Sequence, residues 1–258
     1  MVEFAPFEFI EGAADSRILL LCDHASNVLP PEYGDLGLPA RQFERHIAYD
    51  IGAAAVTRLL QRSLNAPALM TRYSRLLIDP NRGADDPTLV MRISDGAMVP
   101  ANARIGGEEI ARRRAAYWQP YRDKINEVID NMMKSGQVPV VVSVHSFTPF
   151  WRGQARPWQI GILWDKDPRF AVPVIEALRG QGWVVGDNEP YDGALKGDTL
   201  YDTATARGLA HVLVEFRQDL VADETGALEW AQHFEKALQI ALQAPHLDVV
   251  RAYGSRAG

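Results

Sequence analysis

The feature that most constrains the fold is the run QVPVVVSVHS, which covers residues 137–146. Val and Pro fill most of this run, and no residue from Val138 to Val144 carries a charge. A short, uncharged run of this kind is typical of a strand that is buried on both faces, as in the sheets of α/β proteins. The strand ends in His145 and Ser146. Because ligands of open α/β sheets bind beyond the carboxyl ends of the strands, His145 is a candidate for chemistry.

The rest of the chain alternates between strand-like and helix-like patterns. Further buried strands are predicted at 17–23, 67–73, 75–79, 159–165, 183–186 and 210–217. Apolar residues recur with helical spacing at 39–64, 108–135, 167–180, 199–207 and 224–242. Pro120 is expected to kink or split the second of these helices. This alternation predicts an α/β protein with three layers, α/β/α, around a central mixed, largely parallel sheet.

Length and composition favour one domain over residues 1–258, with a core at about 17–242. The chain has 258 residues, of which 47% are hydrophobic, and this is enough for one large core. No change in composition marks a boundary. We expect residues 1–16 to form an irregular lead-in, residues 85–106 a long loop that is functional or mobile, and the tail 246–258 to be frayed.

Charge and targeting signals narrow the function classes. The net charge of −6 argues against nucleic acid or an acidic membrane surface as the main partner. The single cysteine, Cys22, excludes an intramolecular disulfide. The N-terminus lacks the basic segment of a signal peptide, and no apolar run approaches the ~18 residues of a transmembrane helix. We therefore expect a cytoplasmic protein, whose oligomeric state the sequence does not predict.

Polar residues stand at four predicted strand ends. They are His24, the pair Asn81 and Arg82, His145 and Glu215. We expect these ends to share one cleft. Two imidazoles can bind a zinc ion, and a carboxylate usually completes a catalytic zinc site. A nearby glutamate can transfer protons, and the planar fork of arginine suits a substrate carboxylate.

The segments around these residues resemble zinc-dependent hydrolases. SVHSF at 143–147, RLLIDPNR at 75–82 and VEFRQDL at 214–220 are similar to segments of zinc carboxypeptidases and aspartoacylases. The chain as a whole most resembles the N-formylglutamate amidohydrolase family. Over residues 17–242 the motifs that carry this resemblance are LLCDHASN, HIAYDIGA, DPNR, GDNEPY, ARGL and VEFRQDL.

The resemblance implies a phosphorylase/hydrolase-like fold and one Zn²⁺ ion. It implies hydrolysis of the amide bond of a small N-acyl amino acid, above all N-formyl-L-glutamate, to formate and glutamate. His24 and His145 would bind the metal, and Glu215 would be the general base and acid. Arg75 would polarise the scissile carbonyl.

Further residues are candidates for contacts with the substrate. The resemblance implies that Asn81 and Arg82 hold a substrate carboxylate. Arg217 lies two residues after Glu215, on the same face of the predicted strand, and is expected to orient it. Asn188 follows a predicted strand and is expected to reach the cleft.

The third metal ligand is open. Carboxypeptidases place a glutamate three residues after the first histidine, and this chain has Asn27 there. Asp50 is our candidate, because it lies on the predicted helix that follows the His24 loop. Asp23 and His46 are the alternatives, although Asp23 would point to the opposite side of the sheet if the strand continued.

Two alternative functions follow from the same residues. One is a carboxypeptidase- or aspartoacylase-like hydrolase with another acyl group or a peptide substrate. The other is an inactive protein that binds a small molecule on the same fold without metal, which Asn27 keeps open.

Overall fold

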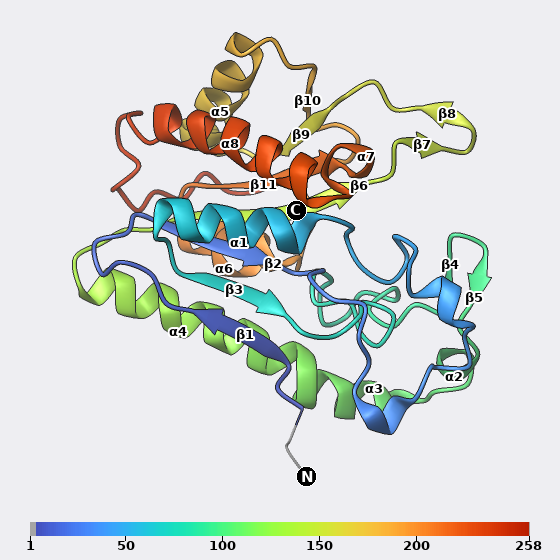
Figure 1. The fold of residues 1–258 in the computed structure, drawn as a ribbon. Helices are drawn as coiled ribbons and strands as arrows, with labels where there is room; N and C mark the ends of the chain where they lie inside the picture. Colours follow the sequence, from blue (N-terminus) through green and yellow to red (C-terminus); the bar gives the residue numbers. More distant parts are fainter. Residues whose placement is uncertain (1–3, 258) are drawn as a thin grey trace.

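The computed structural model describes residues 4–257. A seven-stranded mixed sheet forms the middle of the molecule (Figure 1) in the order β1-β3-β2-β6-β11-β9-β10. Its strands are β1 (Phe7–Ile10), β2 (Ile18–Cys22), β3 (Ala68–Thr71), β6 (Val140–Phe147), β9 (Ile160–Leu163), β10 (Val185–Asp187) and β11 (His211–Arg217). Strands β3, β2, β6 and β11 run parallel to one another. Strand β1 runs antiparallel to β3, and β9 runs antiparallel to β11 but parallel to β10. The predicted mixed, largely parallel sheet is confirmed.

Helices cover both faces of the sheet. The first face packs against α1 (Ala53–Leu64), α5 (Pro168–Gly180), α7 (Gln218–Val221) and α8 (Glu224–Ala241). The second face packs against α4 (Gln119–Lys134) and α6 (Thr199–Thr203). Alternate residues of β2 show the division, because Leu20 joins the first core cluster and Leu19 and Leu21 join the second. The expected α/β/α layers are therefore present.

The same alternation places two predicted site residues side by side. In β6, Val144 belongs to the core under α1 and α8, so its neighbour His145 faces the opposite layer. In β11, Val214 and Phe216 belong to that same core, so Glu215 also faces the opposite layer. The two strands are parallel, and Glu215 is the register partner of His145. The sheet therefore presents both side chains on one face.

The predicted helix at 39–64 is shorter than expected. Only a 3₁₀ turn, η2 (Ala40–Gln42), and helix α1 are helical in this range. Gly52 has a φ of 82°, and a Cβ there would lie 2.2 Å from the carbonyl oxygen of Val221. This left-handed conformation, which glycine adopts readily, interrupts the helical path before α1. Asp50 therefore lies in a turn that precedes the helix and not on the helix itself.

The segment 75–79 was predicted as a strand and is instead a series of turns. Its backbone groups bond outside any sheet, because Leu77 N donates to Ser74 O within the segment and Arg75 N donates to Ala48 O in a distant turn. Leu76 packs into one small core cluster, and Leu77 and Ile78 pack into another. The apolar side chains of this run pack into two separate clusters, and its backbone does not pair with a strand. The run therefore has the composition of a strand but not its structure.

Pro120 divides the predicted helix at 108–135 as expected. The segment consists of α3 (Gly107–Arg113), a π-helical turn η3 (Arg114–Trp118) and α4. Pro120 lies in the first turn of α4, where its missing N–H is least costly.

Shorter elements complete the fold. The predicted loop 85–106 contains a hairpin of β4 (Ile93–Ser94) and β5 (Ala97–Met98), followed by α2 (Pro100–Ala103). A second hairpin pairs β7 (Phe150–Trp151) with β8 (Gln154–Ala155). The remaining 3₁₀ turns are η1 (Pro31–Tyr33) and η4 (Thr205–Arg207).

The lead-in is more regular than predicted, and two residues of the tail are anchored to the rest of the molecule. The lead-in contains the edge strand β1, while residues 1–3 lie outside the described part of the chain. In the tail, Leu247 is 1% exposed and joins the main core cluster. Arg256 pairs with Asp165 and Asp192. These contacts hold the tail at Leu247 and Arg256, whereas most of its other side chains are exposed. Fraying of the rest of the tail stays a prediction, and Gly258 is not described.

Candidate active site

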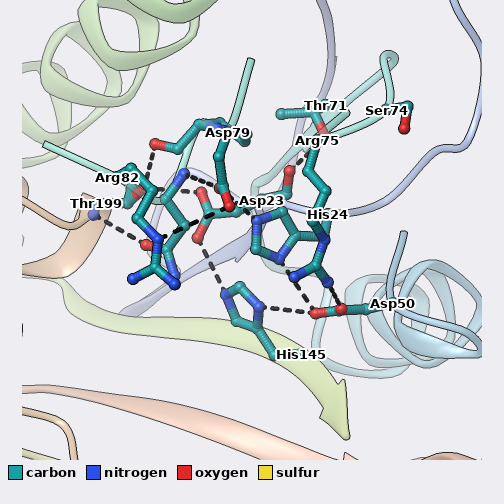
Figure 2. A network of polar contacts seen from close by, with 12 residues as sticks. Asp23, His24, Asp50, Thr71, Ser74, Arg75, Asp79, Arg82, His145 and Thr199 are labelled. Carbon is teal, nitrogen blue, oxygen red and sulfur yellow. Dashed lines mark hydrogen bonds and ion pairs between the residues drawn. The ribbon is translucent and has the colours of Figure 1, made fainter. Parts of the chain in front are cut away.

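Three side chains from distant parts of the sequence meet at the carboxyl end of β2 and β6 (Figure 2). His24 follows β2, Asp50 precedes α1, and His145 lies in β6. Nδ1 of His145 and Nδ1 of His24 lie 2.8 Å and 3.3 Å from the same oxygen, Oδ2 of Asp50. All three residues are buried, and their candidate ligand atoms lie within 4.8 Å of one another. Asp50 N donates to His24 O at 3.0 Å, which holds the turn beside the histidine loop.

The far nitrogen of each histidine faces another carboxylate. Nε2 of His24 lies 2.7 Å from Oδ1 of Asp79, and Nε2 of His145 lies 3.1 Å from Oδ2 of Asp23. A carboxylate beside Nε2 favours the tautomer with the proton on that atom. The lone pair of each Nδ1 is then directed towards Asp50. Metal-binding histidines are commonly held in this way.

The charges of the cluster suit a cation. Burial, reinforced by Arg75, lowers the pKa of His24 to about 4, so its imidazole is neutral near pH 7. Burial by itself would raise the pKa of Asp79, but His24 and Arg75 outweigh it and hold this pKa well below the usual range. Burial by itself would also raise the pKa of Asp23, but the hydrogen bond and the charge of His145 outweigh it and lower this pKa. A neutral imidazole flanked by ionised carboxylates is a ligand set for a divalent metal.

The structure distinguishes the three alternatives for the third ligand. Asp50 lies between the histidines, and its second oxygen pairs with Arg75. Asp23 lies behind His145 and contacts its Nε2 instead. Nδ1 of His46 accepts a hydrogen bond from Nε2 of Gln218 at 2.7 Å and lies 3.3 Å from Oδ1 of Asp50. Asp23 was expected to point to the opposite side only if the strand continued; β2 ends at Cys22, and Asp23 and His24 both reach the cluster.

Glu215 lines the cavity that contains the cluster, which has a volume of about 340 Å³. Its side chain is buried, and Oε2 has no hydrogen-bond partner among residues 4–257. Burial raises the pKa of Glu215 to about 7, although His145, Arg75 and Arg156 act in the opposite direction. A carboxyl group with this pKa can both accept and donate a proton near neutral pH.

The three predicted site residues of the RLLIDPNR motif also line this cavity: Arg75, expected to polarise the scissile carbonyl, and Asn81 and Arg82, expected to bind a substrate carboxylate. The Nε atoms of Arg75 and Arg82 are buried and have no hydrogen-bond partner in the described chain. Asn81 is held in place because Thr199 N donates to its Oδ1 at 3.0 Å. These donors are therefore positioned beside the cluster.

Two predicted residues are not brought to the cavity. Arg217 donates from Nε to Asp219 at 2.8 Å and does not line the cavity, so its position does not support an orienting role for Glu215. Asn188 accepts at Oδ1 from Trp164 N and Gly193 N and stabilises its own loop. Both side chains bond to groups outside the cavity, including Trp158 O for Arg217 and Trp164 N for Asn188, which spacing along the sequence does not reveal.

Sequence reasoning missed several polar residues that support the site. Asp79 stands within the motif around Asn81 and Arg82, but nothing in the sequence linked it to His24. Ser143 donates to Asp23 at 3.0 Å, and its position two residues before His145 was the available signal. Thr199 donates to Asp23 at 3.0 Å from the start of α6, and no local pattern marks it. Asn27, which stands where carboxypeptidases have a glutamate, donates to Phe43 O at 2.8 Å.

A mixed sheet that collects two histidines, several carboxylates and a buried glutamate in one cavity defines an α/β enzyme with a candidate metal centre. The model of the N-formylglutamate amidohydrolase family matches residues 16–222. The chain belongs to this family. Membership supports the hydrolysis of an amide bond and a small-molecule substrate.

Solved structures agree with this assignment. The chain is similar to the crystal structure of a gene product from Agrobacterium tumefaciens, with 35% identity, a TM-score of 0.88, and coverage of 92% of this chain and 94% of that one. N-formylglutamate amidohydrolase from Ralstonia eutropha JMP134 has the same fold, with 19% identity, a TM-score of 0.68, and coverage of 93% and 98%. Comparison with curated proteins gives no significant match. Within residues 4–257, no helix has the length and apolar character to cross a membrane.

Proposed function

We propose that the chain is a zinc-dependent amidohydrolase of small N-acyl amino acids, with N-formyl-L-glutamate as the first candidate substrate. The observation that carries this proposal is the arrangement of the two histidines. Both Nδ1 atoms face one oxygen of Asp50, and each Nε2 is held by a separate carboxylate. A purely structural pair of buried histidines does not require this arrangement.

The donor set fits zinc. Two imidazole nitrogens and one carboxylate oxygen are a common ligand set of catalytic zinc sites, which keep one position open for water or substrate. His24, His145 and Asp50 would hold the ion. When bound, zinc would polarise the amide carbonyl and make water more acidic. The buried carboxylates of Asp23 and Asp79 would keep the histidines in the tautomer that binds it.

Glu215 would transfer the protons of the reaction. It would take a proton from water as the water oxygen adds to the acyl carbon, and would give it to the amide nitrogen as the C–N bond breaks. The products are formate and glutamate. Its unpartnered Oε2 and its pKa of about 7 support this role.

The arginines and Asn81 would bind and orient the substrate. Arg75 contacts Asp50 and lines the cavity, so it lies where an oxygen of the reacting carbonyl could be stabilised. Arg82 lines the same cavity with an unpartnered Nε, which suits a carboxylate of the amino acid. Asn81 is fixed beside it by Thr199.

The proposal is tested by metal analysis and formate release on the same preparation. We expect about one zinc ion per chain, release of formate from N-formyl-L-glutamate, loss of this activity with a chelator and recovery with added zinc. N-acetyl-L-aspartate in parallel distinguishes the deformylase from an aspartoacylase-like activity. A chain that binds no zinc under any condition contradicts the proposal and favours a metal-free binding protein.

A further inference from the structure

A second cavity of about 530 Å³ adjoins the one that contains the candidate metal centre, and we call it the outer cavity. His46, Arg75, Arg82 and Tyr191 line both cavities. The two therefore meet at Arg75 and Arg82, to which contacts with the substrate are assigned, and at His46 and Tyr191. The far walls of the outer cavity come from the hairpins β4–β5 and β7–β8, which project from the same side of the molecule (Figure 1).

Aromatic side chains form one wall of the outer cavity. Phe150 and Trp151 in β7 line it and are 60% and 48% exposed. Exposed aromatic surface is costly in water, and when it lines a cavity it is typical of a binding surface.

A buried guanidinium holds this wall in place. Arg156 is 9% exposed, and its Cζ lies 5.4 Å from the ring centroid of Trp151 and 5.1 Å from that of Tyr191. Its Nη1 donates to the carbonyl oxygen of Thr148 and to the hydroxyl of Tyr191, both at 3.2 Å. The contacts with both rings attach the β7–β8 hairpin to the segment that carries Tyr191. The aromatic wall is therefore preorganised.

The outer cavity also has excess positive charge. Arg45 is neutralised by Asp95, at 2.7 Å. Arg82 approaches Asp79 only to 3.9 Å, and Arg152 lies exposed with its Cζ 5.7 Å from the Trp151 ring. Aromatic rings beside guanidinium groups suit a planar aromatic group that is attached to a carboxylate-bearing amino acid.

We propose that the outer cavity binds an aromatic acyl group, so that the enzyme hydrolyses N-aroyl amino acids in addition to the N-formyl compound. This inference rests on the proposed amidohydrolase function and specifies its substrate class. A formyl group has one carbon and cannot reach from the reacting carbonyl to Phe150 and Trp151. In an N-aroyl amino acid the ring would lie against these side chains. Water adds to the acyl carbon and the C–N bond breaks, which gives an aromatic carboxylic acid and the free amino acid.

The kinetic test compares N-benzoyl-L-glutamate with N-formyl-L-glutamate on the zinc-loaded protein. We expect Trp151→Ala to lower kcat/KM for the benzoyl substrate about tenfold and to leave the formyl substrate within about twofold. Phe150→Ala should act in the same direction. Met98→Ala is the matched control, because Met98 is 62% exposed on the neighbouring hairpin but does not line the outer cavity.

A binding measurement separates this inference from the proposed function. N-benzyl-L-glutamate has the same ring and amino acid but no amide bond, and its Kd is measured by calorimetry. If Trp151→Ala weakens this binding about tenfold while neither amide is hydrolysed, the aromatic subsite stands and the amidohydrolase function fails. If formate is released but Trp151→Ala and Met98→Ala have equal effects on both substrates and on binding, the aromatic subsite is wrong and the function stands.

Discussion

Asp79 is the residue that best distinguishes a metal centre from a structural cluster. It lies 2.7 Å from Nε2 of His24 and is not part of the group that could bind the ion. Its effect on a bound metal would be indirect, through the tautomer and orientation of His24.

We expect Asp79→Asn to weaken zinc binding about 10- to 100-fold, because an amide holds the Nε2 proton less firmly than a carboxylate. Competition with a chromophoric chelator measures the change. Asp95→Asn is the control, since Asp95 is exposed and pairs with Arg45 on the β4–β5 hairpin. Equal zinc affinities for the two variants would contradict the assigned role of Asp79.

Glu215 lowers the stability of the fold at the pH where it would act. Its pKa is raised from 4.5 to about 7 by burial, so the folded chain binds this proton more tightly than the unfolded chain. Stability therefore falls as pH rises from about 4.5 to about 7, and the full penalty applies above that range.

The variant Glu215→Gln should lose at least ~100-fold in amide hydrolysis while it gains stability. Because Gln carries no charge, we expect the metal-free variant to exceed the wild type at pH 8 by about 3 kcal/mol in the free energy of unfolding, and to match it near pH 4. Urea denaturation at the two pH values measures this difference. Full activity would remove Glu215 from the reaction.

At the scale of elements, α4 holds the loop that carries Asn81 and Arg82. Arg122 is 3% exposed and projects from this helix. Its Nη2 donates to the carbonyl oxygens of Pro80 at 3.1 Å and Arg82 at 3.2 Å, and its Nη1 pairs with Asp202 in α6. One side chain therefore connects α4, the loop of Asn81 and Arg82, and α6.

We expect Arg122→Met to destabilise the protein by about 3–5 kcal/mol, because it removes the charged hydrogen bonds of a buried guanidinium to Pro80 O and Arg82 O together with its ion pair to Asp202. It should also raise KM more than it lowers kcat, since the loop that positions Arg82 is loosened. Thermal unfolding and steady-state kinetics test the two effects. Lys134→Met, at the exposed C-terminal end of the same helix, should change stability by only a few tenths of a kcal/mol.

At the scale of the whole molecule, one core cluster contains residues from Ile18 to Leu247. We propose on this basis that the chain folds as one domain, in which the C-terminal segment takes part. The segment is fixed by the buried side chain of Leu247 and by the ion pairs of Arg256.

Leu247→Ala should therefore lower the stability of the whole protein by about 2–5 kcal/mol. Far-UV circular dichroism and tryptophan fluorescence should show the same, lower midpoint in denaturant. Val250→Ala provides the control, because Val250 is 49% exposed in the same segment. A tail that is detached in solution would make the two variants equal to the wild type.

The sequence by itself determined the layers of the fold and most residues of the candidate site. Helix and strand periods are local, so buried runs such as the one that ends in His145 can be recognised without a structure. Their polar ends indicated His24, Asn81, Arg82 and Glu215. The tertiary structure decided which polar groups meet. A turn before α1 places Asp50 between the histidines. The fold also brings Asp79 to Nε2 of His24 and Asp23 to Nε2 of His145. It directs Arg217 and Asn188 to groups outside the cavity and packs Leu247 of the tail into the core. These outcomes depend on contacts between residues far apart in the chain and on turn geometry, and no local period encodes either of them.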